Sequence, residues 1–329
     1  MRGFRDDLIE RLTESNPVTP SSVEGEARSL AGRRLLRQIT SQPHRRGPRK
    51  TAWTAAAAAI VVLALALTQI LPEGGRRASA ATKILLSTAD VAKARVGTAG
   101  SGGYRYLATE VETWQALEIG SSQSVVMVRS LRELWIAPDG SGRQRVSRVE
   151  PMFLSPADQR AWEAAGSPSP VAASDDTYAS GQLAYQDVSD LPTDPDELSE
   201  LLRTAAGFAD RPANVQMLIE IADLLRLPDA SPELRAALYR VAAGIEGVQL
   251  LGDVTDATGR TGTAVGIEFE ESGDMQRTAI LFDPETSRVL EIRTEILEPV
   301  TWTDATPPLL VDYTLYLDSG IVDSTSERP

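Results

Sequence analysis

The chain has 329 residues, a net charge of −13 at pH 7 and no cysteine. The lack of cysteine excludes disulfide bonds, cysteine zinc sites and thiol nucleophiles. The single histidine, His44, lies close to the N-terminus, so the rest of the chain has no imidazole for a Ser-His-Asp triad or a transition-metal site. A pair of carboxylates of the glycosidase kind is the enzymatic option that remains. No acidic residue is singled out by apolar neighbours, so the sequence predicts no catalytic residue, cofactor or metal site.

The charge is unevenly distributed along the chain. Residues 1–50 carry 11 Lys or Arg against 6 Asp or Glu, residues 51–72 carry no charge, and residues 73–329 carry 22 against 40. The acidic part is long enough to bury a sizeable core. Its negative charge disfavours nucleic acid and anionic lipid head groups as partners.

Residues 1–50 are expected to form a basic arm with two short helices. Phe4, Leu8 and Leu12 follow at i, i+4 and i+8 and form one apolar stripe. Short amphipathic helices bury too little surface to be stable alone, so this stripe is a candidate binding surface for a cytoplasmic partner. Two alternatives stay open: the arm lies on the inner leaflet, or it is disordered and only sets topology.

Residues 51–72 form an apolar run without a charge. As an α-helix, about 20 apolar residues cover the roughly 30 Å hydrocarbon core of a bilayer. The preceding residues 28–50 hold eight Lys or Arg, ending at Arg49 and Lys50, and no acidic residue. The positive-inside rule therefore places the N-terminus in the cytoplasm, with Trp53 at the inner membrane interface. The prediction is a single-pass protein of the cell membrane with an extracytoplasmic C-terminal part.

A cleaved signal peptide is the alternative to a retained anchor. Ala78-Ser79-Ala80 resembles a cleavage site, after which the mature chain would begin at Ala81. Two features favour retention: the leader before the apolar run is about 50 residues long, and the run exceeds the roughly 7–15 residues of an h-region.

Residues 73–103 are expected to form a juxtamembrane helix, over residues 77–96, and a glycine-rich linker. Residues 104–329 are expected to form one extracytoplasmic α+β domain. Strands are expected over residues 104–111, 124–136, 143–149, 248–254, 263–269, 276–282, 289–297 and 309–317. The short connections among the last five predict an antiparallel meander.

Between the two groups of strands, residues 192–246 have a helical period. Asp194-Pro195-Asp196-Glu197 combines a capping residue, a proline at the first helical position and a capping-box glutamate. Further helices are expected over residues 213–227 and from Ser231 onward. Three helices packed on a sheet are expected, and a lid over an apolar cavity is the alternative. Residues 165–181, rich in Ser, Pro and Asp, are expected to be a loop.

Three aspartates, Asp253, Asp256 and Asp283, lie at expected turns and could bind Ca²⁺. They do not match an EF-hand loop. Turn chemistry explains each of them, so no calcium site is predicted.

Several segments resemble an actinobacterial family of single-pass membrane proteins of unknown function, often described alongside extracytoplasmic-function sigma factors and their anti-sigma factors. The segments are Trp135-Ile-Ala-Pro-Asp-Gly-Ser-Gly-Arg143, Leu191-Pro-Thr-Asp-Pro195, Pro232-Glu-Leu-Arg-Ala-Ala-Leu-Tyr-Arg240, Gly247-Val-x-x-x-Gly-Asp-Val-Thr-Asp256 and Phe282-Asp-Pro-Glu-Thr286. The outer part is also similar to the half-barrel of envelope lipid or lipoprotein carriers and related periplasmic regulators, which is a likeness of fold.

The resemblance implies a curved, half-barrel-like antiparallel sheet with helices on one face, preceded by the transmembrane helix and the arm. It implies a membrane-anchored sensor or anti-sigma-like regulator that is not an enzyme, with a cytoplasmic sigma factor bound through residues 1–42. The alternative is a membrane-anchored carrier for an envelope lipid or lipoprotein. Zinc-type anti-sigma domains use a His and Cys cluster, so an arm without cysteine would have to bind as bare helices in a groove.

Overall fold

The computed structural model describes residues 73–95, 103–119, 122–153, 156–167, 171–207, 211–300 and 306–329. The arm and the expected span lie outside these ranges. So do all the site residues expected from the sequence, namely Phe4, Leu8, Leu12, Arg49, Lys50 and Trp53. None of the helices within the described ranges is long and apolar enough to cross a bilayer.

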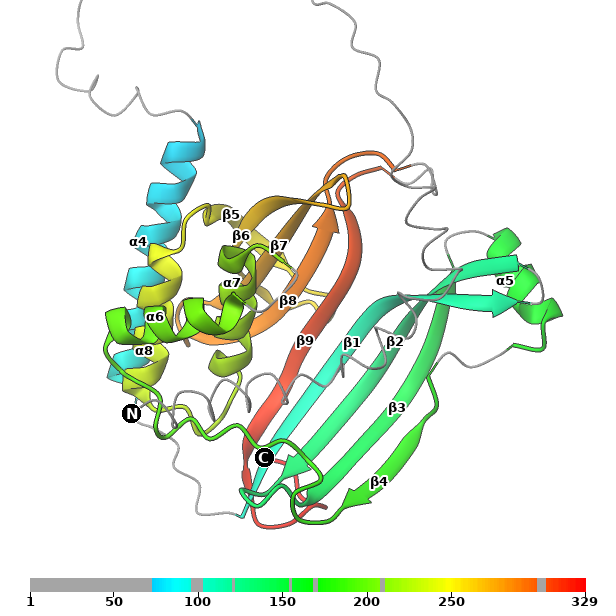
Figure 1. The fold of residues 1–329 in the computed structure, drawn as a ribbon, viewed down its shortest axis with the longest axis horizontal. Coiled ribbons are helices and arrows are strands. Elements are labelled where there is room, and N and C mark those ends of the chain that lie inside the picture. Colours follow the sequence, from blue (N-terminus) through cyan, green and yellow to red (C-terminus); the bar gives the residue numbers. More distant parts are fainter. Residues whose placement is uncertain are drawn as a thin grey trace, which may run out of the picture.

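The described chain is an α+β structure with five helices and nine strands (Figure 1). The helices are α4 (Glu73–Ala94), α5 (Pro156–Ala164), α6 (Pro195–Ala206), α7 (Ala213–Leu225) and α8 (Pro232–Gly244). The strands are β1 (Tyr104–Ile119), β2 (Ser122–Ile136), β3 (Gly142–Phe153), β4 (Ser174–Tyr178), β5 (Gln249–Thr255), β6 (Thr261–Glu271), β7 (Asp274–Asp283), β8 (Arg288–Ile296) and β9 (Leu309–Val322).

All nine strands belong to one open antiparallel sheet, in the order β4-β3-β2-β1-β9-β8-β7-β6-β5. The meander expected for the last five strands is confirmed, because β5 to β9 pair in sequence order. A second meander, β1 to β4, joins the first through β9. This strand pairs with β1 from Tyr104↔Val322 to Thr113↔Asp312 and with β8 on its other side.

The helices α4, α6, α7 and α8 gather beside the β5–β9 half of the sheet, and α4 lies against α8 (Figure 1). Ala81, Leu85, Ala89 and Ala92 form one buried stripe on α4, at the spacing that puts side chains on one helix face. They share a single hydrophobic cluster with α6, α7, α8 and the covered face of the sheet. The helix expected near residues 77–96 is therefore part of the core.

The capping signals act as the sequence predicts. Asp194 Oδ1 accepts hydrogen bonds from the backbone N–H groups of Asp196 (3.0 Å) and Glu197 (3.1 Å) at the start of α6. The Ser231 hydroxyl oxygen accepts one from Leu234 N–H (3.1 Å) at the start of α8. Both helices begin with a proline, whose missing N–H costs nothing at that position.

The loop expected over residues 165–181 is wrong in part, because β4 lies within it. This strand carries no apolar alternation, since it is a mostly exposed edge strand that pairs only with β3. An ion pair between Arg143 Nε and Asp175 Oδ1 (2.6 Å) joins the two strands. Charged side chains therefore contribute to the pairing of β4 where other strands would use apolar ones.

The C-terminal tail, residues 324–329, folds back over the face of the sheet opposite the helices. Trp135 Nε1–H donates to Glu327 O (2.6 Å), and Arg328 Nε–H donates to the buried Glu133 (2.6 Å). Arg143 donates to Thr325 O (3.1 Å). The tail thereby covers Trp135.

Candidate functional site

A groove of about 510 Å³ lies between the helical layer and the sheet. Its walls come from the C-terminal end of α4, the connection between α7 and α8, the turn between β7 and β8, and the strands β1 and β9. The volume falls within the roughly 300–1,000 Å³ of small-molecule sites. Because the walls belong to separate layers, a bound molecule would contact α4, the other helices and the sheet together.

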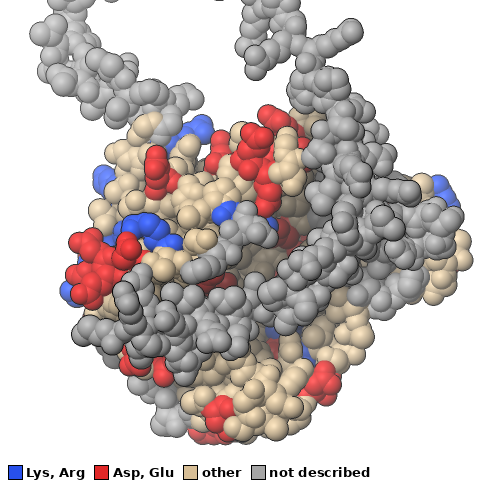
Figure 2. Space-filling model, viewed as in Figure 1, with Lys and Arg blue, Asp and Glu red and all other residues tan. Residues whose placement is uncertain are grey.

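Four arginines line the groove: Arg95 follows α4, Arg226 ends α7, Arg235 lies in α8 and Arg288 begins β8. Asp318 is the one acidic residue among the described residues that line it. This local positive charge differs from the chain as a whole, which is acidic. On the face drawn in Figure 2, acidic side chains form separate groups with basic side chains between them. The net negative charge of the chain is therefore compatible with a local group of basic side chains.

Within the described ranges, the Arg235 guanidinium donates only to neutral backbone carbonyls. Its partners are Leu225 O (2.6 Å), Ala230 O (3.2 Å) and Leu227 O. These carbonyls belong to the C-terminal end of α7 and the turn after it, where a helix leaves acceptors without intrahelical partners. Arg235 therefore caps α7 and keeps its own positive charge without a carboxylate partner.

The charged groups around Arg235 are of both signs. Burial lowers the pKa of Arg235 and is the largest effect. Tyr239 and Asp229 raise this pKa, and the positive charges of Arg288 and Arg95 lower it by smaller amounts. The guanidinium remains charged at neutral pH because its ordinary pKa is above about 12. Arg95 and Arg288 therefore lie near enough to Arg235 to act on it, and the opposite charge of Asp229 acts on it too.

The other arginines of the groove differ in how far they are neutralised. Arg226 forms an ion pair with Asp223 (3.0 Å). Arg95 donates from Nη1 to Thr286 O (2.8 Å) and has no carboxylate within ion-pair distance among the described residues. The Arg288 side chain is exposed and has no hydrogen-bond or ion-pair partner in the described part of the chain. The arginines without an ion pair, which we call uncompensated, are thus Arg95, Arg235 and Arg288. Asp283 and Asp229 act on Arg95 and Arg235 without forming an ion pair with them.

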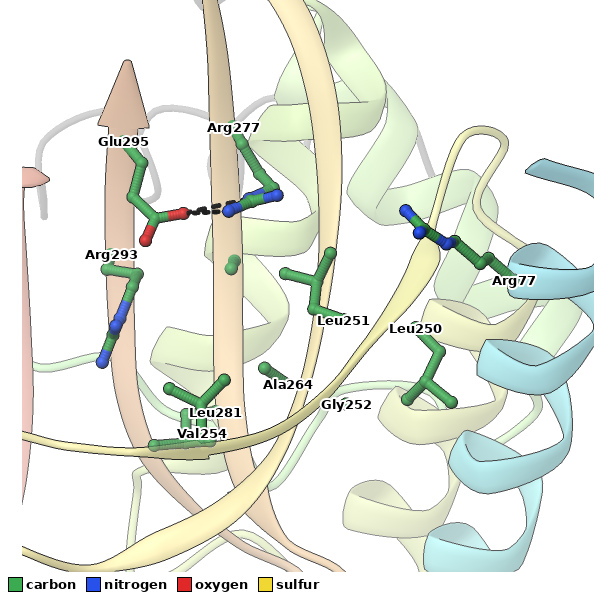
Figure 3. A pocket seen from close by; sticks show the side chains of 11 residues that line it. Arg77, Leu250, Leu251, Gly252, Val254, Ala264, Arg277, Leu281, Arg293 and Glu295 are labelled. Carbon is green, nitrogen blue, oxygen red and sulfur yellow. Dashed lines mark hydrogen bonds and ion pairs between the residues drawn. The ribbon is translucent and has the colours of Figure 1, made fainter. Parts of the chain in front are cut away.

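A second hollow, of about 400 Å³, lies on the opposite face of the sheet under β5 (Figure 3). Its floor is apolar and includes Leu251, Val254 and Leu281. Arg77, from the first turns of α4, flanks this hollow (Figure 3). We call it the outer-face hollow.

The arginines contributed by the sheet to the outer-face hollow are already neutralised. Arg277 donates to Glu295 (2.7 Å), as the dashed lines in Figure 3 mark, and Arg293 forms an ion pair with Glu291 (2.5 Å). Only Arg77 lacks such a partner among the described residues. The groove, with three uncompensated guanidinium groups, is therefore the stronger candidate for a charged ligand.

The buried carboxylates are engaged in ion pairs. Each of the four is held by an arginine, in the pairs Glu112–Arg129, Glu133–Arg328, Asp256–Arg260 and Glu291–Arg293. A glycosidase-type site uses two carboxyl groups that face one substrate bond. Carboxylates that are held by arginines are less available for such a role.

The three aspartates considered for Ca²⁺ have other partners. Asp256 accepts hydrogen bonds from Thr258 N–H (2.8 Å) and Arg260 N–H (2.9 Å). Asp283 accepts them from the turn that follows it, and Asp253 from the Thr263 hydroxyl (3.3 Å). Within the described ranges, no group of three or more acidic or histidine side chains could hold a metal ion.

No protein-family model and no curated protein sequence matches this chain. The function must therefore be argued from the geometry of the site. The sequence did not predict the groove, because its arginines come from positions 95, 226, 235 and 288 on four separate elements. Of the four arginines, only Arg235 could be placed on an element from its neighbours in the sequence, because it follows the capped start of α8 at Ser231.

Proposed function

We propose that the chain is a membrane-anchored, non-enzymatic sensor whose extracytoplasmic domain binds a ligand in the groove. The observation that supports this proposal is the position of α4. Its C-terminal end, at Ala92 and Arg95, lines the groove, and its N-terminal end begins directly after the apolar run expected to span the membrane. With 22 residues, α4 extends about 33 Å, so one rigid element would link the groove to the bilayer.

The contacts of α4 favour transmission along it. Thr82 donates to Ala243 O (3.3 Å), and Arg240 forms an ion pair with Asp90 (3.2 Å), so α4 and α8 are joined at two levels besides their apolar contact. A ligand drawn to Arg95 and to Arg288 would bind α4 and the sheet at once. Its binding energy would then favour one position of α4 relative to the sheet over another.

The output side of the proposed sensor is the cytoplasmic arm. Phe4, Leu8 and Leu12 would dock in a hydrophobic groove of a partner, with a sigma factor as the proposed partner of residues 1–42. The arginine-paired buried carboxylates support a binding role for the outer domain over a catalytic one.

The proposal is tested by a photo-crosslinker at Leu8 of the full chain in native membranes. We expect capture of a cytoplasmic protein, with a yield that changes at least twofold when Arg288→Ala weakens the groove. Lys93→Ala is the matched control, because Lys93 is also exposed but does not line the groove. Equal capture in all three proteins would show that the groove and the arm are not coupled.

The second candidate function is the lipid or lipoprotein carrier, which is favoured by the apolar floor of the outer-face hollow. Against it, the helical layer and the covered face of the sheet share one hydrophobic cluster, so side chains occupy much of the space in which a half-barrel carrier would hold its cargo. Native mass spectrometry of the full chain tests this alternative. A reproducible lipid adduct that Ala264→Phe removes, by filling the outer-face hollow, would favour the carrier.

A further inference from the structure

We propose that the ligand of the groove is a small organic anion with at least two negative charges, carried by a phosphoryl group or by neighbouring carboxyl groups. This inference rests on the proposed function for its biological use, whereas the binding chemistry follows from the groove itself.

The charge of the ligand follows from the uncompensated arginines. Arg95, Arg235 and Arg288 line the groove and form no ion pair within the described chain. The charges of Arg95 and Arg288 act on Arg235, and Asp229 offsets part of its charge. Like charges in a partly desolvated groove repel one another unless an anion lies between them. Asp229 and Asp283 offset part of the three positive charges. A monoanion would still leave most of the remaining charge uncompensated, whereas a dianion would neutralise most of it.

The guanidinium groups also have donors to spare. Each guanidinium has five N–H donors. Arg235 donates three of them to backbone carbonyls and Arg95 donates one, whereas Arg288 donates none to the described chain. The free donors match the fork geometry that binds phosphate or carboxylate oxygens with two parallel hydrogen bonds.

Asp318 indicates where in the groove the anionic group lies. It lines the groove from β9 and would repel an anion next to it. Arg235 belongs to α8 and Asp318 to β9, so the two line different walls of the groove. The anionic group is therefore expected beside Arg235 and Arg288, away from Asp318.

The remaining walls suit the body of an organic ligand. Leu107, Leu225, Val289 and Tyr316 contribute apolar surface. A groove of about 510 Å³ also exceeds what one phosphoryl group needs, so the ligand is larger than a free inorganic ion. Small-molecule sites commonly combine such apolar walls with a few charged groups that fix orientation.

The test uses the full chain in detergent micelles at constant ionic strength, with inorganic pyrophosphate, citrate and acetate as probes in isothermal titration. We expect pyrophosphate or citrate to bind and acetate, a monoanion, not to bind. The better of the two multivalent probes shows whether phosphoryl or carboxyl groups are preferred. Binding of none of the probes, or equal binding of all three, would overturn the proposal.

Variants then locate the site. Arg288→Ala should weaken binding of the multivalent probe at least tenfold, and Arg288→Glu should abolish it, because this exposed side chain has no structural partner to lose. Lys93→Ala should leave binding unchanged. If all three variants bind like the wild type, the anion binds elsewhere and the assignment to the groove is wrong.

The two proposals fail in distinguishable ways. If the multivalent anion binds and Arg288→Ala abolishes binding, but crosslinking from Leu8 does not respond, the anion site stands and the sensor proposal is wrong. If crosslinking responds to Arg288→Ala and no anion binds, the coupling stands and the ligand class is wrong.

Discussion

Asp256 is a single residue whose charge holds a turn together. Its side chain is fully buried, and its Oδ2 accepts a hydrogen bond from the Arg260 guanidinium (2.6 Å). Burial raises the pKa of this carboxyl, but the hydrogen bonds from Thr258 and Arg260 outweigh burial, and the pKa lies below its usual value. A lowered pKa in the folded state means that the ionised form stabilises the fold. That stability is present above the usual aspartate pKa of about 4 and is lost as the pH falls through the folded-state value.

We expect Asp256→Asn to lower the free energy of unfolding at pH 7 by about 2 kcal/mol, because Arg260 loses its charged acceptor. The difference from the wild type should shrink as the pH falls below about 4. Thermal unfolding of the full chain, followed by circular dichroism at pH 7 and pH 3, measures both effects. Asp176→Asn, at an exposed position on β4, is the control. A difference that stays constant between the two pH values would contradict this account.

The contacts of Arg260 show which interactions local sequence patterns do not predict. The turn expected at Asp256 from its residue chemistry is confirmed, because Asp256 accepts from Thr258 N–H and Gly259 has a positive φ. The Arg260 guanidinium, however, also donates to Leu290 O (3.0 Å) and Tyr316 O (2.8 Å), which lie 30 and 56 positions away. Contacts at such separations depend on the path of the whole sheet, which no local spacing encodes.

Among the elements, the helical connection is tied to the sheet by one buried arginine. Arg105 of β1 is 3% exposed and forms an ion pair with Asp229, which lies between α7 and α8. Its guanidinium also donates to Gln186 O (2.9 Å) and lies 4.1 Å from the centre of the Tyr185 ring. The Tyr185 hydroxyl donates to Asp229 (3.1 Å), so β1, the segment before α6 and the α7–α8 connection meet at one cluster.

We expect Arg105→Met to destabilise the full chain by about 3 kcal/mol, because Asp229 would keep its charge without its partner. The double variant with Asp229→Leu should recover part of that loss, since both members of the pair are then removed. Thermal unfolding of the two single variants and the double variant forms the cycle. Additive losses in the double variant would show that the two residues act independently.

Helices and strands were not equally predictable. The start of α6 follows from Asp194 and Pro195, because capping depends on neighbours within three residues. The short strand β4 could not be recognised, because Ser174–Tyr178 is polar and becomes a strand only by pairing with β3. The same contrast holds for the groove, whose arginines meet only once the helices are placed on the sheet.

For the whole molecule, the decisive feature is that β9 joins two meanders. Leu315 on β9 is fully buried and pairs with Glu110 of β1 and Glu291 of β8. The hydroxyl of Tyr313 donates to Glu110, 203 positions earlier in the chain (3.1 Å). The sequence predicted the meander of β5 to β9 and the strands β1, β2 and β3, but not β4. It carried no signal for the pairing of β9 with β1, because that contact links the two ends of the domain.

We expect Leu315→Pro to prevent folding of both meanders, because proline removes a ladder donor in the middle of the sheet and clashes there. Thr177→Pro in the edge strand β4 is the matched control and should have a much smaller effect. Limited proteolysis of the full-length variants measures the outcome. If the β1–β4 half of Leu315→Pro resists protease as the wild type does, the two meanders fold independently.

The central place of β9 has a consequence for biogenesis. Of the nine described strands, β9 (residues 309–322) emerges last during synthesis, yet the sheet needs it in its middle. Until it arrives, β1 and β8 each present an unpaired edge, and such edges recruit other chains. If the domain crosses the membrane from its N-terminal side, as the charge pattern predicts, the exported part lacks β9 and stays incompletely folded outside the membrane until β9 has followed. Its yield should then depend on envelope holdases, and most strongly when translation is slowed shortly before residue 309.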